Sequence, residues 1–324
     1  MAIRVKSPGL LTTVQDTGRF GEYALGMPPS GAMDVFSYQV GNYLVGNEEG
    51  VAGLEITYFG PELEFTEGAV IAVTGAEMPP KINGEEAPTW EALEVGEGDV
   101  LSFDYLKNGA RSYLAVAGGI DVPLFMHSRS TYTLIGLGGH EGRALQEGDE
   151  LSIGESANGS GQVGKRVDDD HIPAYSKETE LRVIIGLASY RLTEESMEEF
   201  LNTTWTVTPD ADRVGYRYRG GELKFVEREQ PAGAGSDPAN VVDFGYPIGS
   251  IQVPGGVEPI VLMNDAVTGG GYATIGTVIS ADRDKLAQTK TNDKTTFRSV
   301  ELDEALEARK QRRQQMEEIK GSLS

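Results

Sequence analysis

The sequence predicts a mainly β protein, built as two strand-rich halves with a few helices. Its 42 glycines are scattered among apolar runs and do not gather in low-complexity tracts, which is typical of a turn-rich β protein. The apolar runs are short, and glycine or proline separates them. Strands and helices do not alternate in the way that indicates a doubly wound sheet. A length of 324 residues suits one large or two medium domains.

The first half begins with strands that lead into a polar turn. Residues 3–6 alternate in the manner of a strand, and residues 11–14 form a β-branched run. This run ends in Gln15 and Asp16, and Arg19 follows beside a glycine. We therefore expect polar side chains at the end of the second strand.

One clear helix is predicted in the first half, from Met33 to Leu44. Its apolar residues recur at helical spacing, and Ser30 and Asp34 lie near its start. Gly46 can cap its end.

Turn-and-strand units follow the helix and recur along the chain. Residues 97–103 begin with Glu-Gly-Asp before a strand, residues 147–153 are a near-copy, and residues 291–297 are a weaker echo. We interpret these units as equivalent pieces of structure and not as sites. Residues 111–117 form another buried strand, which ends in a glycine turn.

Composition changes between the two halves. Residues 156–178 combine glycine, serine and three consecutive aspartates, which is typical of a solvated linker. The second half then opens with a strand and a helix that Thr193 can cap. A broken apolar stripe marks a charged terminal helix, formed by Leu302, Leu306, Met316 and Ile319. We expect a first subdomain at residues 1–155, a linker at 156–178, a second subdomain at 179–300 and the helix at 301–324.

A buried strand at residues 260–263 leads into polar residues and glycines. It delivers Asn264, Asp265 and Thr268 into three consecutive glycines at 269–271. A rigid strand that ends in short polar groups and permissive glycines can support a binding site. A tight turn between two core strands explains the same pattern, so both interpretations stay open.

Composition argues against several classes of function. A net charge of −22 repels phosphate backbones and anionic membranes, so neither nucleic acid nor membrane is expected as a partner. The chain has no cysteine, and none of its three histidines is spaced as a metal ligand, so no metal site is expected. No signal peptide or membrane span is recognisable, which predicts a cytoplasmic protein. Phosphate-loop, dinucleotide-binding, nucleophile-elbow and Met-Lys biotin-attachment motifs are absent, so we expect this chain to bind no cofactor itself.

Polar residues on glycine-rich turns are the remaining candidates for chemistry. Arginine can clamp a carboxylate, amides can stabilise an oxyanion, and aspartate can act as a base. This inventory suits acyl or carboxyl transfer at an amide nitrogen without covalent catalysis. We predict catalytic roles for Asp16, Arg213, Asn264 and Asp265. We predict substrate-binding roles for Gln15, Arg19, Asp34, Tyr216, Gln252, Thr268, Gly270, Gly271 and Tyr272.

Each candidate also has a structural interpretation, which the sequence leaves open. Arg19 and Arg213 either converge on one cleft and bind a carboxylate, or pair with Asp16, Asp34 or Asp212. Tyr216 and Tyr272 can instead be core residues.

Several motifs, in the same order along the chain, carry a resemblance to one family. They are Thr12-Thr13-Val14-Gln15-Asp16-x-Gly18-Arg19, Gly31-Ala32-Met33-Asp34, Leu54-Glu55-Ile56-Thr57, residues 111–123, Asp212-Arg213-Val214-Gly215-Tyr216-Arg217, and Gln252-Val253-Pro254 through Gly270-Gly271-Tyr272. Over residues 3 to 310 the chain resembles the allophanate hydrolase subunit 2 family. This family is also called biotin-dependent carboxyltransferase-like or KipI antagonist, and it includes the C component of bacterial 5-oxoprolinase.

The resemblance implies two cyclophilin-like β-barrel subdomains and an active site shared with partner chains. It implies a subunit 1 homologue (KipI-like, the B component of 5-oxoprolinase) and a lactam-utilisation homologue (the A component). The complex of these chains would use ATP to open 5-oxoproline to glutamate. Apolar residues beside the first polar turn are expected at the partner interface, namely Phe20, Tyr23, Met27 and Pro28.

Two other interpretations of the resemblance stay open. The chain can be the carboxyltransferase half of a split biotin-dependent enzyme of the urea type. It can also be a regulatory antagonist of a sensor-kinase inhibitor.

The sequence departs from the family in the loop after residue 263, in the longer segment at residues 231–246, and at His127 and His140. Family members usually read Asn-Asp-x-Gln-Thr-Thr-Gly-Gly-Tyr, whereas Val267 replaces the glutamine and Gly269 replaces the second threonine here.

Overall fold

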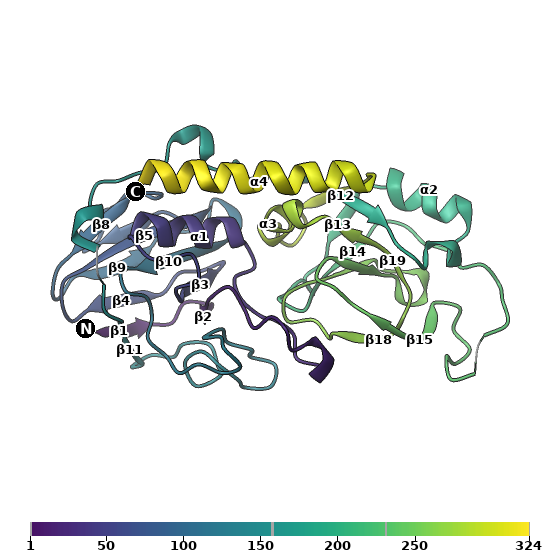
Figure 1. Ribbon diagram of the computed structural model, residues 1–324, viewed down its shortest axis with the longest axis horizontal. Helices are drawn as coiled ribbons and strands as arrows, with labels where there is room; N and C mark the ends of the chain where they lie inside the picture. Colours follow the sequence, from purple (N-terminus) through teal and green to yellow (C-terminus); the bar gives the residue numbers. More distant parts are fainter. Residues whose placement is uncertain (1, 157–158, 231, 324) are drawn as a thin grey trace. The chain divides into compact units, whose positions relative to one another are not determined.

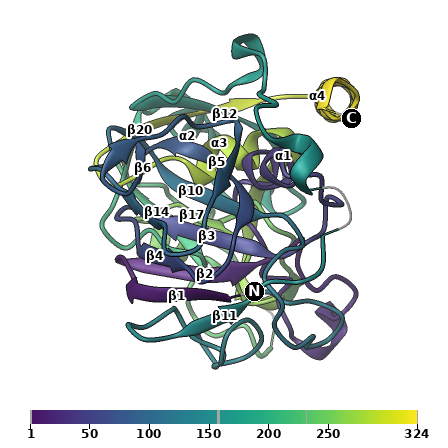
Figure 2. The same cartoon turned by 90° about the vertical axis from the view of Figure 1, so that its left-hand side faces the viewer.

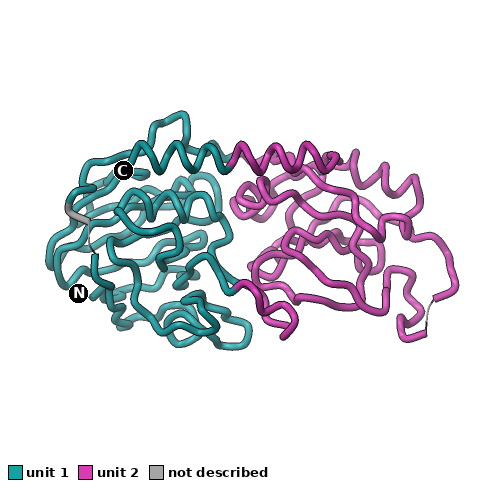
Figure 3. Tube along the Cα trace, in the orientation of Figure 1, with its two compact units in different colours: residues 1–19, 30–175, 313–324 teal, residues 20–29, 176–312 magenta. Residues whose placement is uncertain are grey.

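The chain divides into two compact units (Figures 1 and 3). The computed structural model describes residues 2–156, 159–230 and 232–323. Unit 1 comprises Met1–Arg19, Ser30–Tyr175 and Arg313–Ser324, and unit 2 comprises Phe20–Pro29 and Ser176–Arg312. The mainly β class is confirmed, and so is the C-terminal helix.

Unit 1 is built on two antiparallel sheets around one core (Figure 2). The six-stranded sheet has the order β11 (Glu150–Ser152), β1 (Ala2–Ser7), β4 (Glu62–Phe65), β9 (Val100–Phe103), β6 (Pro80–Ile82) and β7 (Glu85–Glu86). The five-stranded sheet has the order β2 (Leu11–Gln15), β3 (Gly53–Thr57), β10 (Asn108–Val116), β5 (Ala69–Glu77) and β8 (Ala92–Val95). Ile3, Leu63 and Leu101 from the first sheet meet Leu54, Ile71 and Leu114 from the second in a continuous buried cluster.

Helix α1 (Val35–Leu44) covers β5 and β10 of the second sheet. The Asp34 carboxylate caps it by accepting hydrogen bonds from the Ser37 N–H (3.0 Å) and hydroxyl (2.6 Å). The predicted helix is confirmed, and it starts at residue 35 because Asp34 is its extended N-cap. Gly46 follows the C-cap residue with φ +75°, a conformation that favours glycine.

Residues 159–175 pack against unit 1, although their composition is that of a solvated linker. The Val167 N–H bonds the Trp90 carbonyl at 3.0 Å, and the Val167 side chain is buried beside α1. Ile172 packs against the same cluster, and the Asn108 side chain donates to the Tyr175 carbonyl at 2.5 Å. These contacts are long-range, so composition alone does not reveal them. Residues 157–158 of the expected linker lie outside the described residues.

Unit 2 contains a closed seven-stranded barrel. Its strands follow the order β12 (Glu178–Ile185), β19 (Thr274–Val278), β16 (Ser250–Gln252), β17 (Ile260–Leu262), β14 (Gly215–Arg219), β13 (Trp205–Val207) and β20 (Lys294–Ser299). The parallel pairing of β12 with β20 closes the barrel. Helix α2 (Glu194–Asn202) packs on β20, where Phe200 stacks on Phe297 with ring centroids 4.7 Å apart. Thr193 caps α2 as predicted, by accepting the Ser196 N–H at 3.2 Å.

A two-stranded ribbon lies outside the barrel of unit 2. It pairs β15 (Asn240–Gly245) with β18 (Gly269–Tyr272). The sequence leaves a binding loop and a tight turn open at the three glycines, and in the structure they form most of strand β18. A Cβ on Gly269 would approach the Phe244 carbonyl to 3.0 Å, and one on Gly270 would approach the Tyr246 ring to 3.2 Å. Glycine thus permits the close approach of β18 to its neighbours.

Two further helices complete the fold. Helix α3 (Arg283–Ala287) is short, and α4 (Leu302–Leu323) is the charged terminal helix. Within unit 2, Ala305 and Ala308 pack near Ile279, whereas Leu302 and Leu306 of the expected apolar stripe are exposed. Within unit 1, Ile319 and Leu323 join the cluster under α1. No helix in the described part of the chain is both long and apolar enough to cross a membrane.

Candidate functional site

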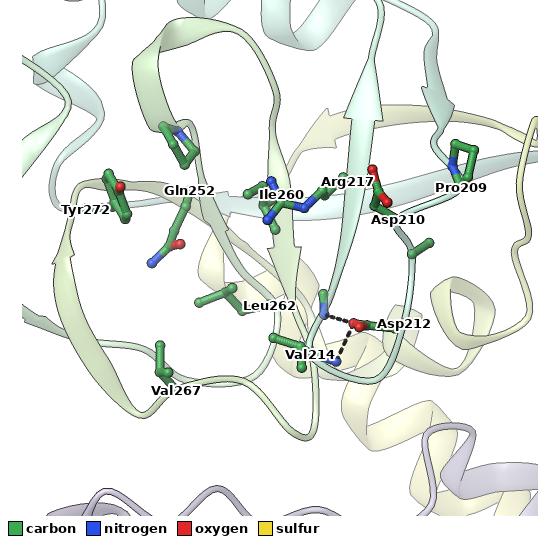
Figure 4. A pocket seen from close by; sticks show the side chains of 13 residues that line it. Pro209, Asp210, Asp212, Val214, Arg217, Gln252, Ile260, Leu262, Val267 and Tyr272 are labelled. Carbon is green, nitrogen blue, oxygen red and sulfur yellow. Dashed lines mark hydrogen bonds between the residues drawn. The ribbon is translucent and has the colours of Figure 1, made fainter. Parts of the chain in front are cut away.

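A hollow of about 820 Å³ lies in unit 2, beside barrel strands β14, β16 and β17 and the ribbon strand β18 (Figure 4). Its lining residues are Pro209, Asp210, Ala211, Asp212, Val214, Gly215, Arg217, Gln252, Pro254, Ile260, Leu262, Val267 and Tyr272. We call it the unit 2 pocket.

The alternation of side chains along the barrel strands selects which residues face the pocket. On β14, Arg217 lines the pocket, whereas Tyr216 is fully buried. On β17, Ile260 and Leu262 line the pocket, whereas Val261 is fully buried. Each strand therefore contributes one face to the pocket and the other to the packed interior.

Gln252, at the end of β16, brings an amide group to the pocket. The residue is only 5% exposed, and its side chain is hydrogen-bonded to the Tyr246 hydroxyl, whose pKa this contact lowers against the larger, opposite effect of burial. In Figure 4 the amide points between Tyr272, Leu262 and Val267. The amide therefore helps to shape the wall of the pocket beside the ribbon strand.

Tyr246 fixes the ribbon strand that carries Tyr272. Its hydroxyl accepts a hydrogen bond from the Tyr272 N–H at 2.7 Å and donates one to the Tyr272 carbonyl at 2.9 Å. Burial raises the pKa of the Tyr246 hydroxyl, so it stays protonated and keeps both bonds. The Tyr272 side chain remains 42% exposed at the pocket.

Charged groups at the pocket are mainly acidic. Asp210 and Asp212 line one side. Asp212 Oδ1 accepts the main-chain N–H groups of Val214 (2.8 Å) and Gly215 (3.1 Å), which shapes the turn before β14. Arg217 is the one cation among the described residues that line the pocket, and its side chain lies 3.8 Å from the Glu258 carboxylate.

Arg213 and Asp265 form a buried ion pair in unit 2. Arg213 Nε donates to Asp265 Oδ2 at 2.7 Å, and Nη2 donates to Oδ1 at 3.2 Å. The Asp265 N–H also donates to the Arg213 carbonyl at 2.9 Å. This two-pronged contact joins the loop before β14 to the loop after β17, and neither residue lines the pocket. The partner of Arg213 is thus an aspartate that the sequence did not suggest for it.

The other candidates of unit 2 occupy the same loops or the barrel interior. Tyr216 donates weakly toward the Ala287 (3.3 Å) and Thr289 (3.4 Å) carbonyls. Asn264 is buried beside Asp265, and the Thr268 carbonyl accepts the Tyr246 N–H at 2.8 Å. Gly270 and Gly271 belong to β18. Of the predicted residues, the pocket brings together Gln252 and Tyr272.

In unit 1, Gln15 and Asp16 hold the segment that contains residues 128–131. Gln15 Nε2 donates to the Thr131 carbonyl at 3.2 Å. The Asp16 carboxylate accepts four hydrogen bonds at 2.5–2.8 Å, from the N–H groups of Gly18 and Arg129 and the hydroxyls of Ser128 and Ser130. A carboxylate with this many donors is suited to organising a loop.

Arg19 and Asp34 are also committed to contacts within unit 1. Arg19 is buried, donates to the Ser130 carbonyl and lies 5.7 Å from the centre of the Phe125 ring. Asp34 caps α1. The convergence of Arg19 with Arg213 on one cleft stays a prediction, because the two residues belong to different units. The catalytic and binding roles of all thirteen candidates likewise stay predictions.

Sequence reasoning missed two sets of residues. Arg217, Ile260 and Leu262 line the pocket, and the period-two alternation of their strands was the signal that could have found them. Glu55 is a buried carboxylate that accepts the Tyr113 hydroxyl at 2.8 Å and lies 3.7 Å from Arg111. Its signal was a charged residue within an apolar strand.

No metal centre is evident in the described part of the chain, since no three histidine, aspartate or glutamate side chains gather there in a way that could hold an ion.

Known proteins resemble this chain over nearly its whole length. The C component of 5-oxoprolinase from Escherichia coli is 35% identical over 318 residues, which is 98% of this chain and 97% of that protein. The urea amidolyase of Saccharomyces cerevisiae is 34% identical over 303 residues, which is 91% of this chain but only 16% of that protein. The crystal structure of the K. lactis urea amidolyase matches with a TM-score of 0.92 at 32% identity, and covers 98% of this chain and 20% of that one.

These relatives differ in extent, since this chain spans a small part of the urea amidolyases and nearly all of the bacterial protein. A family model described as "Carboxyltransferase domain, subdomain A and B" matches residues 25–299. That match covers most of both units, and we conclude that the chain belongs to the carboxyltransferase domain, subdomain A and B, family.

Proposed function

We propose that this chain is the C component of an ATP-dependent 5-oxoprolinase complex, which opens the lactam of 5-oxoproline to glutamate. The observation that carries the proposal is the end-to-end match with a protein that bears this name. The partners are a subunit 1 homologue and a lactam-utilisation homologue, as the family resemblance implies. ATP is consumed by the complex and is not bound by this chain.

The unit 2 pocket supports a role in handling an amide. Its wall combines the Gln252 amide with the apolar side chains of Leu262 and Val267. Among the described lining residues there is no serine, threonine, cysteine, lysine or histidine, and the polar ones are carboxylates, one guanidinium, one amide and one phenol. Within the complex, this chain therefore binds and orients, and ATP-dependent activation takes place on a partner.

Reconstitution tests the proposal. The chain is co-expressed with a subunit 1 homologue and a lactam-utilisation homologue from the same organism, and glutamate formation from 5-oxoproline is followed with and without ATP. We expect turnover only with all three chains and ATP, and none by this chain alone. Glutamate formation by the two partners without this chain, or its absence from the full mixture, overturns the assignment.

A second candidate is the carboxyltransferase part of a biotin-dependent, urea-type carboxylase, with biotin carried elsewhere. The close structural match to a urea amidolyase favours it. The same reconstituted mixture distinguishes the two, because this candidate requires a biotinylated partner and consumes urea in place of 5-oxoproline.

A further inference from the structure

We propose that a surface of unit 2 binds a partner protein whose contact face has an apolar hollow ringed by lysine and arginine side chains. Leu187, Tyr190 and Val226 form the centre of this surface. We call it the η4 surface, after the short 3₁₀ helix η4 (Ser189–Arg191). The proposal rests on the proposed function only for the identity of the partner, and the residues of the surface carry the rest of the argument.

The three central side chains of the η4 surface are apolar and exposed to solvent. Their exposed fractions are 88% for Leu187, 68% for Tyr190 and 43% for Val226. Leu187 is the most exposed large apolar side chain in the described part of the chain, and none of the three lines the unit 2 pocket. A group of exposed apolar side chains on one surface commonly marks a site of protein contact.

Main-chain hydrogen bonds bring these three side chains together. The N–H groups of Ser189, Arg191 and Leu192 each donate to the carbonyl three residues earlier, so residues 186–192 form successive tight turns. Side chains three residues apart in such turns lie above one another, so Leu187 and Tyr190 are neighbours. The Val226 N–H donates to the Arg191 carbonyl at 2.8 Å, which places Val226 beside the same turns.

Arg191 fixes both the turn and the Tyr190 ring. The residue is only 3% exposed, and its Nη2 donates to the carbonyls of Pro238 (2.8 Å) and Asn240 (2.6 Å). Its guanidinium is also hydrogen-bonded to the Tyr190 side chain. An exposed aromatic ring that a buried group already holds loses little conformational freedom on binding, which is typical of an interface hot spot.

The exposed charges around the three apolar residues are mainly acidic. The Thr193 N–H donates to the Lys224 carbonyl at 3.0 Å, so the segments that follow the turn and that flank Val226 lie side by side. Over residues 192–199 and 222–230 these segments expose two cations, Lys224 and Arg228, and seven glutamates. The glutamates are Glu194, Glu195, Glu198, Glu199, Glu222, Glu227 and Glu229. An apolar centre with an acidic rim complements a protein face with a basic rim.

The acidic rim also argues against the other occupants of such a surface. A symmetric dimer uses the same patch on both subunits, so a second copy would bring this rim against itself. Anionic membranes and nucleic acids are repelled by the same charges. Contact with the subunit 1 homologue is predicted for residues 20–28, which are a separate stretch of chain. We therefore assign the η4 surface to the other partner, the lactam-utilisation homologue.

The test measures the binding of each partner homologue to the immobilised full-length chain by surface plasmon resonance. The lactam-utilisation homologue is titrated with and without the subunit 1 homologue. We expect Tyr190→Ala to weaken its binding at least about tenfold and to leave binding of the subunit 1 homologue unchanged. Leu187→Asp should act in the same direction. Tyr105→Ala, at a highly exposed tyrosine of unit 1, is the matched control and should change neither affinity.

A second measurement tests the charges of the rim. Binding of the lactam-utilisation homologue should weaken when the salt concentration rises from about 50 mM to about 500 mM, because salt screens exposed charges. A double variant, Glu227→Lys with Glu229→Lys, should weaken binding at low salt and remove much of that salt dependence. Both glutamates are exposed, so the chain should stay folded.

Four results would overturn the proposal. The first is binding of the lactam-utilisation homologue to Tyr190→Ala and Leu187→Asp as tight as to the unmodified chain. The second is loss of the subunit 1 homologue in its place. The third is no binding of the lactam-utilisation homologue to the unmodified chain up to roughly 100 μM, which corresponds to only about 5 kcal/mol. The fourth is self-association of the chain that Tyr190→Ala removes, which would assign the surface to a second copy.

Binding is measured without turnover, which separates this proposal from the proposed function. Undiminished assembly and turnover of 5-oxoproline by a complex that carries Tyr190→Ala would reject the η4 surface and leave the proposed function standing. Binding that Tyr190→Ala weakens, in a mixture that does not turn over 5-oxoproline, would support the surface and reject the proposed function.

Discussion

Arg213 shows how the structure changes the meaning of a candidate residue. A substrate clamp must leave its guanidinium free, but both prongs of Arg213 contact Asp265 in a buried setting. The pair joins two loops beside the unit 2 pocket, so it positions the pocket. Its first effect on mutation should be on stability.

We expect Arg213→Lys to lower the free energy of unfolding by about 1–3 kcal/mol, because lysine keeps the charge and loses the two-pronged geometry. Urea unfolding followed by circular dichroism measures this loss. Arg217→Lys is the control, since its pair with Glu258 is half exposed and should be worth less than about 1 kcal/mol. If Arg213→Lys is as stable as the unmodified chain but the complex loses activity, then Arg213 contacts the substrate directly.

Asp149 gives unit 1 a defined sensitivity to acid. The Arg143 side chain donates to its carboxylate at 2.7 and 2.9 Å and lowers the pKa of Asp149 to about 2. The folded-state pKa lies below the unfolded value of about 3.9, so this carboxylate stabilises the fold above about pH 4. The stabilisation is lost as the pH falls from about 4 to about 2.

We expect Asp149→Asn to be less stable than the unmodified chain at neutral pH and equally stable once the pH falls to about 2. The urea concentration at which half of the protein is unfolded, measured at several pH values from neutral to about 2, tests this pH dependence. Glu147→Gln, in the same turn and exposed, should show no such convergence. A constant difference across the whole range would mean that Asp149 acts through packing and not through its charge.

Single residues could be predicted from sequence where their partners are local. The Asp34 and Thr193 caps follow from spacing within one turn of chain. The Arg213 pair spans 52 positions, and the place of Gln252 in the pocket wall depends on strands that lie far apart in the sequence. Neither property is encoded in local spacing, so the sequence could name these residues without assigning their surroundings.

At the scale of elements, one hydroxyl adds to the strand pairing that holds the ribbon of β15 and β18. Three of the four residues in β18 are glycine and contribute no side-chain packing, so the Tyr246 hydroxyl provides much of what fixes Tyr272. The ribbon should therefore loosen without that hydroxyl.

We expect Tyr246→Phe to speed amide hydrogen exchange in residues 269–272 and to cost about 1–2 kcal/mol of stability from two lost hydrogen bonds. Mass-spectrometric hydrogen exchange resolves this ribbon from the barrel. Tyr105→Phe, at a highly exposed tyrosine, is the control and should leave the exchange unchanged. Equal protection of residues 269–272 in both variants would show that strand pairing alone holds the ribbon.

The same ribbon shows which strands could be predicted from the sequence and which could not. The turn-and-strand units were recognisable, since a polar turn precedes apolar alternation at β9, β11 and β20. A strand of glycines has no alternation to recognise, and its existence depends on pairing with a distant segment. Element type was therefore predictable where side chains carry a pattern and not where the main chain alone does.

At the scale of the whole molecule, the mainly β class and the family resemblance are confirmed. Short apolar runs separated by glycine or proline predicted the class, and the order of the motifs along the chain predicted the family. The division into units was less predictable. Residues 20–29 belong to unit 2 and residues 313–324 to unit 1, so neither unit is a continuous piece of sequence.

The segment at residues 20–29 is where we expect the partner chain to bind. Phe20 is 66% exposed and Leu25 is 70% exposed, on a segment whose Pro28 is buried. Two exposed apolar side chains on a short segment, which is anchored at one end, can supply the apolar centre of an interface. Tyr23 and Met27 are half-buried and support the segment.

We expect Phe20→Asp to weaken the complex with the subunit 1 homologue by at least about tenfold, because an aromatic hot-spot residue contributes about 2 kcal/mol or more, and about 1.4 kcal/mol is already tenfold. Size-exclusion chromatography of the co-expressed pair at micromolar concentration should show one peak for the unmodified chain and two for the variant. Leu302→Asp, at an exposed leucine of α4, is the control and should leave a single peak. A single peak for Phe20→Asp would mean that the interface lies outside residues 20–29. It would not affect the unit 2 pocket, since Gln252 and Tyr272 lie on other segments of unit 2.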